Sequence, residues 1–359
     1  MSANQLYHTW LERIRQLRPH ERITRLRNFA WMAVGILRSR SVHLSLIAEK
    51  IPGLATTVSK ARRVRRFLNN RAVHVREWYE PMARDVLQRA VDHGLDVRLL
   101  ADGTKVGFGH QLLMVALAYR KRAIPIAWTW VRSARGHSSA RKQRALLAYV
   151  RGLLPPEAQV TIAGDSEFGA IAVLKQLERW QWHYVMRQQG STRVKLPDHP
   201  VWWRFASLVT KGDRPRWMPV AQLTRQHAYP VHLVAWWKAG EKEPWLLATN
   251  LPTVREAIRV YKRRMWIEEM FGDFKRHGFD LESSHLRHFL RLSRLTLIVA
   301  FLYLWLVAFG SQVIKRGQRR LVDRVDRRDL SIFRIGLSMM ERLLTNAEPF
   351  TIRFKPYFS

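Results

Sequence analysis

The stretch from residue 97 to residue 187 constrains the fold of this chain most, because its hydrophobic period changes repeatedly and in a fixed order. Short apolar runs typical of strands alternate with longer runs of helical period. We predict three strands, a helix, a strand, a second helix and a last strand: 97–101, 112–119, 124–130, 138–153, 160–164, 168–180 and 183–187. The first three indicate an antiparallel meander, and the alternation that follows indicates an α/β domain.

Two acidic residues leave the ends of predicted strands in this domain. Asp102 follows the first strand and precedes Gly103 and Thr104, and Asp165 follows the fourth strand. The order of strands and helices is that of an RNase H-like core, in which these two strands would be neighbours. A single aspartate at a strand end is often only a turn former. Two at matching positions indicate a shared carboxylate site.

The segment 261–275 supplies a third set of polar side chains. It contains no proline, and most of its residues favour helix. On a helix that advances about 100° per residue, Tyr261, Arg264, Glu268 and Lys275 fall within an arc of roughly 60°. Apolar residues on the neighbouring arc would face the core. A carboxylate flanked by two cations suits a metal ion bound beside a phosphate. A surface helix with i,i+4 ion pairs is the alternative.

The first 95 residues have helical periodicity and a basic character. They contain 18 Lys or Arg against 7 Asp or Glu. The segments 43–50 and 57–67, separated by Pro52-Gly53, resemble a helix, a turn and a second helix. Arginines on the second helix, which could lie against DNA, are Arg62, Arg63, Arg65 and Arg66. A solvated basic face is the alternative, and the charge excess favours DNA contact.

The composition narrows the class of partner. The formal charge is +34, from 62 Lys and Arg against 28 Asp and Glu, which indicates a polyanionic partner such as nucleic acid. An apolar content of 47% is ample for a core. The chain has no cysteine, which excludes disulfides and thiolate metal sites and fits a reducing cytoplasm. We expect a cytoplasmic protein that associates with the nucleoid when it is bound to DNA.

One long apolar stretch raises the question of a membrane span. Residues 295–309 are almost wholly apolar, but the stretch is shorter than the roughly 20 residues that a spanning helix needs. It directly follows the segment with the candidate glutamate. We therefore predict a buried helix and no membrane contact, with a membrane protein that carries a basic domain as the alternative.

The remaining chain completes the predicted organisation. Strand-like runs rich in tryptophan, among proline and glycine, indicate a β-rich insertion over residues 188–250. The predicted domains are a helical DNA-binding region, the first part of the core, the insertion, the second part of the core and a basic, helical C-terminal tail: 1–95, 96–187, 188–250, 251–314 and 315–359.

The polar pattern of 261–275 resembles a known signature. The spacing Tyr261-x2-Arg264-x3-Glu268-x6-Lys275 is similar to the YREK signature of the DDE transposases that bacterial insertion sequences encode. Upstream, Asp102-Gly103-Thr104 resembles the first motif of that family, and Asp165-Ser166-Glu167-Phe168 resembles the second, Asp-x-Glu-Phe. The resemblance covers approximately residues 97–310. It implies an RNase H-like enzyme that catalyses cut-and-paste transposition.

The resemblance also implies roles for individual residues. Asp102, Asp165 and Glu268 would be the catalytic carboxylates. We expect Asp102 to bridge two Mg²⁺ ions, for which Mn²⁺ could substitute, with Asp165 and Glu268 each holding one ion. Tyr261, Arg264 and Lys275 would hold DNA phosphates.

Two further residues are implied as DNA contacts. Trp245, in the run Trp245-Leu246-Leu247-x-Thr249, resembles the family tryptophan that stacks on a base flipped out of the element's end. A core tryptophan is the alternative. Arg187 matches a family arginine near the DNA. The implied partners are transposon-end DNA, target DNA and a second copy of the chain, which would form a homodimer when two ends are paired. A non-catalytic regulator derived from a transposase is the competing function.

Overall fold

Ten strands form one continuous mixed sheet in the computed structural model, which describes residues 3–107, 109–132 and 138–358. The strand order is β3-β2-β1-β4-β5-β10-β9-β8-β6-β7. β1 pairs parallel with β4, and β4 pairs parallel with β5. The other pairs are antiparallel. The strands are β1 Val97–Val106, β2 His110–Tyr119, β3 Arg122–Arg132, β4 Val160–Gly164, β5 His183–Arg187, β6 Arg193–Lys195, β7 Trp202–Arg204, β8 Arg216–Leu223, β9 Tyr229–Trp236 and β10 Trp245–Thr249.

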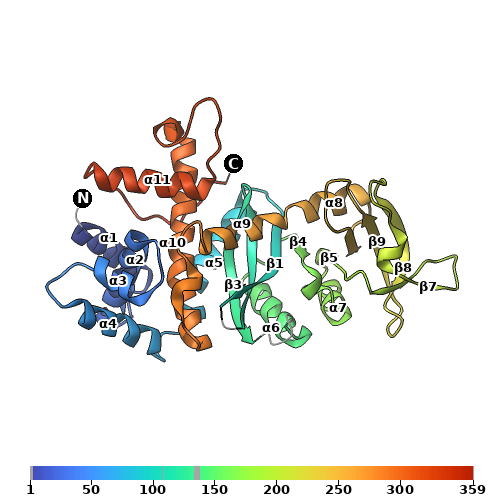
Figure 1. Cartoon of the computed structure of the whole chain (residues 1–359), viewed down its shortest axis with the longest axis horizontal. Helices are drawn as coiled ribbons and strands as arrows, with labels where there is room; N and C mark the ends of the chain where they lie inside the picture. Colours follow the sequence, from blue (N-terminus) through green and yellow to red (C-terminus); the bar gives the residue numbers. More distant parts are fainter. Residues whose placement is uncertain (1–2, 108, 133–137, 359) are drawn as a thin grey trace.

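Helices cover both faces of the central strands. α6 (Ala140–Arg151) and α7 (Ile171–Arg179) pack on one face. α8 (Val254–Lys262) and α9 (Met265–Phe274) pack on the other, with α8 over β4 and β5 and α9 across β1, β2 and β3 (Figure 1). Strand side chains alternate between these faces. On β5, for example, Val185 joins the cluster under α8, whereas Tyr184 and Met186 join the main core. The predicted α/β class and the predicted meander are therefore confirmed.

A set of helices lies beside the β1–β3 end of the sheet. α10 (Phe289–Lys315) is the long helix that runs between the sheet and the N-terminal helices (Figure 1). Aromatic pairs join them: Trp10 contacts Trp305 at 5.3 Å between ring centroids, and Phe29 contacts Phe301 at 5.2 Å. The N-terminal helices are α1 Ala3–Leu17, α2 Ile23–Ser39, α3 Leu44–Lys50, α4 Thr57–Asn69 and α5 Val75–Asp92.

The apolar stretch 295–309 lies inside α10. Of the described helices, α10 alone is long and apolar enough to cross a membrane by length and composition. Its most apolar window is 83% buried within the protein. Arg294, near its start, is buried and donates to the carbonyl oxygens of Leu68 (2.8 Å) and Val73 (3.1 Å). The prediction of a buried helix agrees with this packing.

The predicted single helix over residues 261–275 is wrong. α8 ends at Lys262 and α9 begins at Met265, so a turn separates them. Backbone hydrogen bonds in this turn join residues three apart: Arg264 N donates to Tyr261 O at 2.9 Å, and Ile267 N donates to Arg264 O at 3.1 Å. These bonds replace the i→i−4 pattern of an α-helix. The turn moves Tyr261 out of register with the residues of α9.

The predicted end of the first strand at residue 101 is also wrong. β1 continues to Val106, because its antiparallel pairing with β2 extends to the pair Val106–His110. Its parallel pairing with β4, however, ends at Ala101 and Gly164. Asp102 therefore still pairs with β2, but it lies one residue beyond the last pair between β1 and β4.

The structure adds detail to two segments of the predicted domain list. The β-rich insertion joins the central sheet, because β10 pairs with β5. The C-terminal tail contains one α-helix followed by an extended segment. α11 (Ile332–Thr345) packs on α10, and the segment after it is extended, with Phe354 and Phe358 buried.

Candidate active site

Asp102 and Asp165 meet where the parallel ladder ends. Asp165 follows β4 directly, and its backbone N–H donates to the Ala101 carbonyl at 3.3 Å. This bond fixes the start of the Asp165 segment beside β1, one residue before Asp102. Asp102 is buried, and one of its carboxylate oxygens accepts from Gly103 N at 2.7 Å. Asp165 is half-buried. The sequence prediction that neighbouring strands bring these aspartates together agrees with the geometry.

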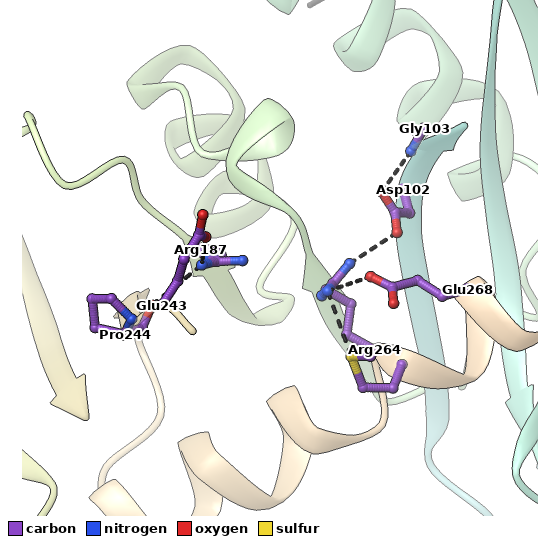
Figure 2. Close-up of polar contacts among 8 residues, drawn as sticks. Asp102, Gly103, Arg187, Glu243, Pro244, Arg264 and Glu268 are labelled. Atoms are coloured by element: carbon purple, nitrogen blue, oxygen red, sulfur yellow. Dashed lines mark hydrogen bonds and ion pairs between the residues drawn. The ribbon is translucent and has the colours of Figure 1, made fainter. Parts of the chain in front are cut away.

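Glu268 reaches the same place from the first turn of α9. The link is Arg264, whose Nη1 donates to Asp102 Oδ2 at 2.9 Å and whose Nη2 donates to Glu268 Oε1 at 2.5 Å (Figure 2). Arg264 and Asp102 are both buried, and the Glu268 side chain is 42% exposed. The guanidinium thus stands between two of the three predicted acids.

The three acids line one cavity. It has a volume of about 400 Å³ and is lined by Asp102, Gly103, Thr104, Asp165, Arg187, Arg264, Glu268, Phe271, Gly272 and Lys275. Lys275 Nζ is anchored at its rim by the Lys105 carbonyl (2.7 Å) and by Glu282 Oε1 (3.1 Å). Four segments of the chain, at β1, after β4, at the end of β5 and around α9, therefore bring three carboxylates and three cations to one cavity.

Burial at the bottom of the cavity disfavours the charged form of Asp102. Burial raises the pKa of Asp102 to about 7, and although Arg264 opposes the rise, Asp165 and Glu268 add to it. Burial alone would lower the pKa of Arg264, but the nearby phenol and carboxylates raise it above its usual value. At neutral pH the Asp102 carboxyl is therefore balanced between its charged and neutral forms. An additional cation would favour the ionised form.

Tyr261 does not line the cavity as the helical-wheel prediction required. It is 2% exposed, and its ring packs against Trp245 with 5.0 Å between centroids. The Arg264 guanidinium carbon lies 5.5 Å from the centre of the same ring. Within the described part of the chain, the Tyr261 hydroxyl and Arg264 Nε are buried without a hydrogen-bond partner. Two donors with no acceptor thus lie directly behind the acids.

Trp245 and Arg187 lie next to this group. Trp245 is half-buried between Tyr261 and Trp236, whose ring centroid is 5.5 Å away. Arg187 lines the cavity, and its Nη2 donates to Glu243 Oε2 at 2.7 Å and to the Pro244 carbonyl at 3.3 Å (Figure 2). Its role as a DNA contact stays a prediction, as does that of Trp245.

The basic helix α4 lies apart from the cavity, among the N-terminal helices (Figure 1). Arg62, Arg65 and Arg66 are exposed, whereas Arg63 packs over Trp31 with 4.2 Å from its guanidinium carbon to the ring centre. The predicted DNA contact of these four arginines is not tested by the fold. The exposed three form a basic face that could meet a phosphate backbone.

The sequence predictions do not include the buried hydrogen-bonded group that packs behind Asp102, on the opposite face of β1. Glu167 is buried on the α6 side of β1, where Gln111 Nε2 donates to its Oε2 at 2.6 Å and Ser138 N donates to its Oε1 at 2.5 Å. Glu167 belongs to the Asp-x-Glu-Phe motif, which was the available signal. Only the first acid of that motif faces the cavity.

A second missed group fixes α9 itself. Asp273 is buried and accepts from Arg122 Nε at 2.9 Å and from the Tyr303 hydroxyl at 3.3 Å. Arg122 Nη1 also lies 3.3 Å from Glu269 Oε2. These contacts tie the helix that carries Glu268 to β3 and to α10. No local sequence pattern could have paired residues this far apart.

The donor chemistry of the cavity suits a hard divalent cation. Three carboxylates and no thiolate are the ligand set that Mg²⁺ prefers. Burial, with smaller contributions from Asp165 and Glu268, raises the pKa of Asp102, and a bound cation would lower it again. Among the residues that the structure describes, no group of three His, Cys, Asp or Glu residues is gathered at metal-binding separation. Here the Arg264 guanidinium occupies the space between Asp102 and Glu268.

Comparison with known proteins gives a matching family and similar solved structures. A family model described as "Transposase DDE domain" matches residues 106–305, which include Asp165 and Glu268 and begin just after Asp102. A cryo-EM structure of a piggyBac transposase synaptic complex with hairpin DNA is similar over 97% of this chain and 80% of that chain, with a TM-score of 0.43 and 10% sequence identity. No curated protein matches.

Proposed function

Because the chain belongs to the family of proteins with a transposase DDE domain, we propose that it cuts DNA at the ends of a mobile element and joins those ends to new DNA. The observation that carries the proposal is the cavity in which Asp102, Asp165 and Glu268 come together with Arg264 and Lys275. Phosphodiester chemistry needs this combination of carboxylates for cations and of cations for phosphate.

Asp102, Asp165 and Glu268 would hold the divalent ions, with Asp102 shared between two and the other acids holding one each. When bound, two Mg²⁺ or Mn²⁺ ions would supply positive charge at the attacking and leaving oxygens of an in-line displacement. The exposure of the acids agrees with these roles. Asp102, which would be shared by two ions, is buried at the centre, and Glu268, which would hold one, is at the open side. The raised pKa of Asp102, which burial, Asp165 and Glu268 cause, supports this assignment, because a bound cation would favour the ionised form.

Arg264 and Lys275 would bind DNA phosphates. Arg264 Nε is a buried donor without a partner in the described chain, so a phosphate oxygen reaching the cavity would satisfy it. Tyr261, expected as a phosphate contact, does not line the cavity and would instead support the Arg264 guanidinium with its ring. Lys275 stands at the rim, where it would offset negative charge on the reacting phosphate. Arg187 lines the opposite part of the cavity, beside the aromatic pair Trp245 and Tyr261, and would contact the same DNA end.

The finer classification follows from the YREK spacing. We assign the chain to the YREK-signature transposases of bacterial insertion sequences, with an RNase H-like core, a β-rich insertion at 188–250 and cut-and-paste chemistry. Cytoplasmic location, with association to the nucleoid through DNA, follows from the charge of +34 and the absence of cysteine. Residues 1–95 would bind the inverted repeats with α4. Pairing of two ends would bring two copies of the chain together as a homodimer.

An excision assay tests the proposal. The gene's own flanking DNA is placed on a donor plasmid, and the protein is supplied with Mg²⁺, as wild type and as Glu268→Gln, Asp102→Asn and Asp165→Asn. We expect excision by the wild type, no excision by the three variants or in EDTA, and retained binding of the ends by all. Glu256→Gln, on α8 and outside the cavity, is the matched control and should excise normally.

Other outcomes identify the competing function. Binding of the ends without excision by any protein, at any divalent ion, would indicate a non-catalytic regulator that kept the fold. Loss of binding in the three acid variants, with Glu256→Gln intact, would mean that the acids are structural.

A further inference from the structure

The candidate active site contains one contact that the proposed chemistry does not use. The Arg264 guanidinium spans two of the acids, because its Nη1 donates to Asp102 Oδ2 at 2.9 Å and its Nη2 donates to Glu268 Oε1 at 2.5 Å (Figure 2). The other oxygen of Asp102 accepts from Gly103 N at 2.7 Å. Each oxygen of the Asp102 carboxylate therefore already accepts a hydrogen bond, and one of these bonds comes from a cation.

A guanidinium in this position competes with a divalent ion. Mg²⁺ binds carboxylate oxygens at about 2.0–2.1 Å, and Arg264 Nη1 lies 2.9 Å from the Asp102 oxygen. An ion on that oxygen would therefore lie within about 5 Å of the guanidinium nitrogen. The side chains of Arg264 and Asp102 are only 7% and 8% exposed, so water screens the repulsion between the two positive charges weakly. The ion and the guanidinium in its present place thus disfavour each other.

A phosphate of DNA would be an alternative partner for the guanidinium. Arg264 Nε is buried and has no hydrogen-bond partner among the described residues, so the contact with the acids does not satisfy the whole guanidinium. A phosphodiester offers oxygens that match the guanidinium fork and accept charge-assisted hydrogen bonds. The side chain of Glu268 is 42% exposed, so a phosphate can approach from its side of the cavity. A phosphate there would compete with the acids for Arg264.

Lys275 lines the same cavity but has different partners. Its Nζ donates to the Lys105 carbonyl at 2.7 Å and pairs with Glu282 Oε1 at 3.1 Å. Within residues 3–107, 109–132 and 138–358, no ion pair joins Lys275 to the three acids. Removal of either Arg264 or Lys275 lowers the charge of the cavity by one, but only removal of Arg264 frees the acids.

We propose that Arg264 couples the binding of divalent ions to the binding of DNA. In the free protein its guanidinium lies in place of an ion between Asp102 and Glu268, and a DNA phosphate takes over its hydrogen bonds and so makes the acids available. This coupling rests on the proposed function, because it takes a DNA phosphate and a divalent ion as ligands of the candidate active site. The ion then binds weakly until DNA has bound, and by reciprocity the ion also tightens DNA binding.

The first test measures Mn²⁺ binding to the full chain without DNA, by titration calorimetry. Arg264→Gln and Lys275→Gln each remove one cation from the cavity. We expect Arg264→Gln to bind Mn²⁺ about tenfold or more tightly than the wild type, within the usual range for coupling between two ligands. Lys275→Gln should stay within about threefold of the wild type, because its charge interacts with Glu282 and leaves the acids free. Heat that persists in Asp102→Asn comes from other sites and is subtracted.

The second test adds DNA to the same titration. The duplex carries the end of the element, and a methylene group replaces the bridging 3′-oxygen at the cleavage site, so that the bond cannot be cut. We expect the duplex to tighten Mn²⁺ binding by the wild type about tenfold or more. The gain should be at least about threefold smaller in Arg264→Gln, because the acids of that variant are already free. A contact of the phosphate with the ion is common to both proteins and cancels in the comparison.

A measurement on the wild type does not depend on the folding of a variant. Arg264 is buried, so thermal unfolding must first show that Arg264→Gln folds. In protein labelled with ¹⁵N-arginine, the Nε–H signal of Arg264 is identified by its absence from Arg264→Lys. The signal should shift when Mg²⁺ saturates the site without DNA, and also when the uncut duplex binds without metal. An unchanged signal in either titration would show that the guanidinium keeps its place and would overturn the inference.

Two outcomes of the calorimetry also contradict the coupling. Equal Mn²⁺ affinities of Arg264→Gln and the wild type would mean that the guanidinium does not hinder the ion. Equal gains in Arg264→Gln and Lys275→Gln would mean that only the total charge of the cavity matters.

The outcome for the proposed function is separate. Excision by the wild type, with equal Mn²⁺ affinities of wild type and Arg264→Gln, would refute the coupling only. Tighter Mn²⁺ binding by Arg264→Gln, with the expected response to DNA but no excision by the wild type, would refute the proposed activity and leave the coupling standing. Failure of every protein to bind Mn²⁺, with or without DNA, would refute the ion sites of the proposed function and the coupling with them.

Discussion

Replacing Gly103 with alanine would test whether the packing behind Asp102 matters for the site. A Cβ at this position would lie 2.6 Å from Glu167 Oε2 and closer still to Gln111 Nε2. An ordinary C···O contact is about 3.4 Å, so Glu167 would have to move by about 0.8 Å. Glu167 cannot move freely, because Gln111 and the Ser138 backbone N–H both donate to it.

The cost follows from those contacts. Disrupting a buried hydrogen bond to a charged group costs about 1.5–3 kcal/mol, and overpacking costs about 1–3 kcal/mol. The two overlap, so we expect Gly103→Ala to lower the free energy of unfolding by about 2–4 kcal/mol. Because the same displacement would reach Asp102, DNA cleavage should fall about tenfold or more. Urea denaturation measures the first effect, and the excision assay measures the second.

Two controls separate this mechanism from a general effect of alanine. Gly240→Ala, in the loop between β9 and β10, would add a Cβ with no atom within 4 Å and should be neutral. In a Gln111→Ala background, the cost of Gly103→Ala should fall by about 1 kcal/mol or more, because one of the clashing atoms is gone. A Gly103→Ala protein within about 0.5 kcal/mol of Gly240→Ala would show that the account of this packing is wrong.

Two further predictions concern the supports of the site. Burial raises the pKa of Asp273 to about 6 in spite of Arg122, so the folded protein disfavours the ionised form, and the contribution of Asp273 to stability is lost as pH rises through 6. Relative to Asp273→Asn, the wild type should lose up to about 3 kcal/mol in unfolding free energy between pH 4 and pH 8, and a difference that grows with pH would contradict this. Trp245→Phe should lower the free energy of unfolding by no more than about 1.5 kcal/mol, because a ring still packs on Tyr261. Trp245→Ala should lower it by about 3–5 kcal/mol. Weaker binding of element ends by the stable Phe variant would indicate that Trp245 contacts DNA in addition to its packing role.

The sequence predicted those parts of the fold that local signals define. The bounds of β4 and β5 agree with the predictions, because the apolar run ends at Gly164 in β4 and gives way to the polar residues Arg187 and Gln188 in β5. Asp102 and Asp165 were expected together, and the end of the parallel ladder brings them together. These successes depend on the period of the apolar residues and on the order of the elements.

The errors come from tertiary contacts that no local pattern carries. The apolar run 97–101 indicated that the strand ends before Asp102, yet β1 continues because β2 pairs with it as far as Val106. Glycine is needed at position 103 for the close approach of Glu167. The wheel for 261–275 gave Tyr261 an outward position, but the turn before Met265 separates it from Glu268, and β10 covers it with Trp245. A helical wheel assumes a straight, continuous helix. The hydrogen bond from Arg264 to Asp102 joins residues 162 positions apart, so no local pattern predicts it.

The pairing of β10 with β5 has a consequence for how this fold could have arisen and how it could be shortened. A core cut down to β1–β5 would expose β5 as an edge, with the apolar residues Tyr184, Val185 and Met186 along it. Open apolar edges pair with other copies and aggregate. The segment 188–250 is therefore no removable module: its strand β10 covers the edge of β5, and any ancestor without it needed another cover for β5. Deletion libraries of this chain should find soluble proteins only where β10 is retained or β5 is blunted by charge.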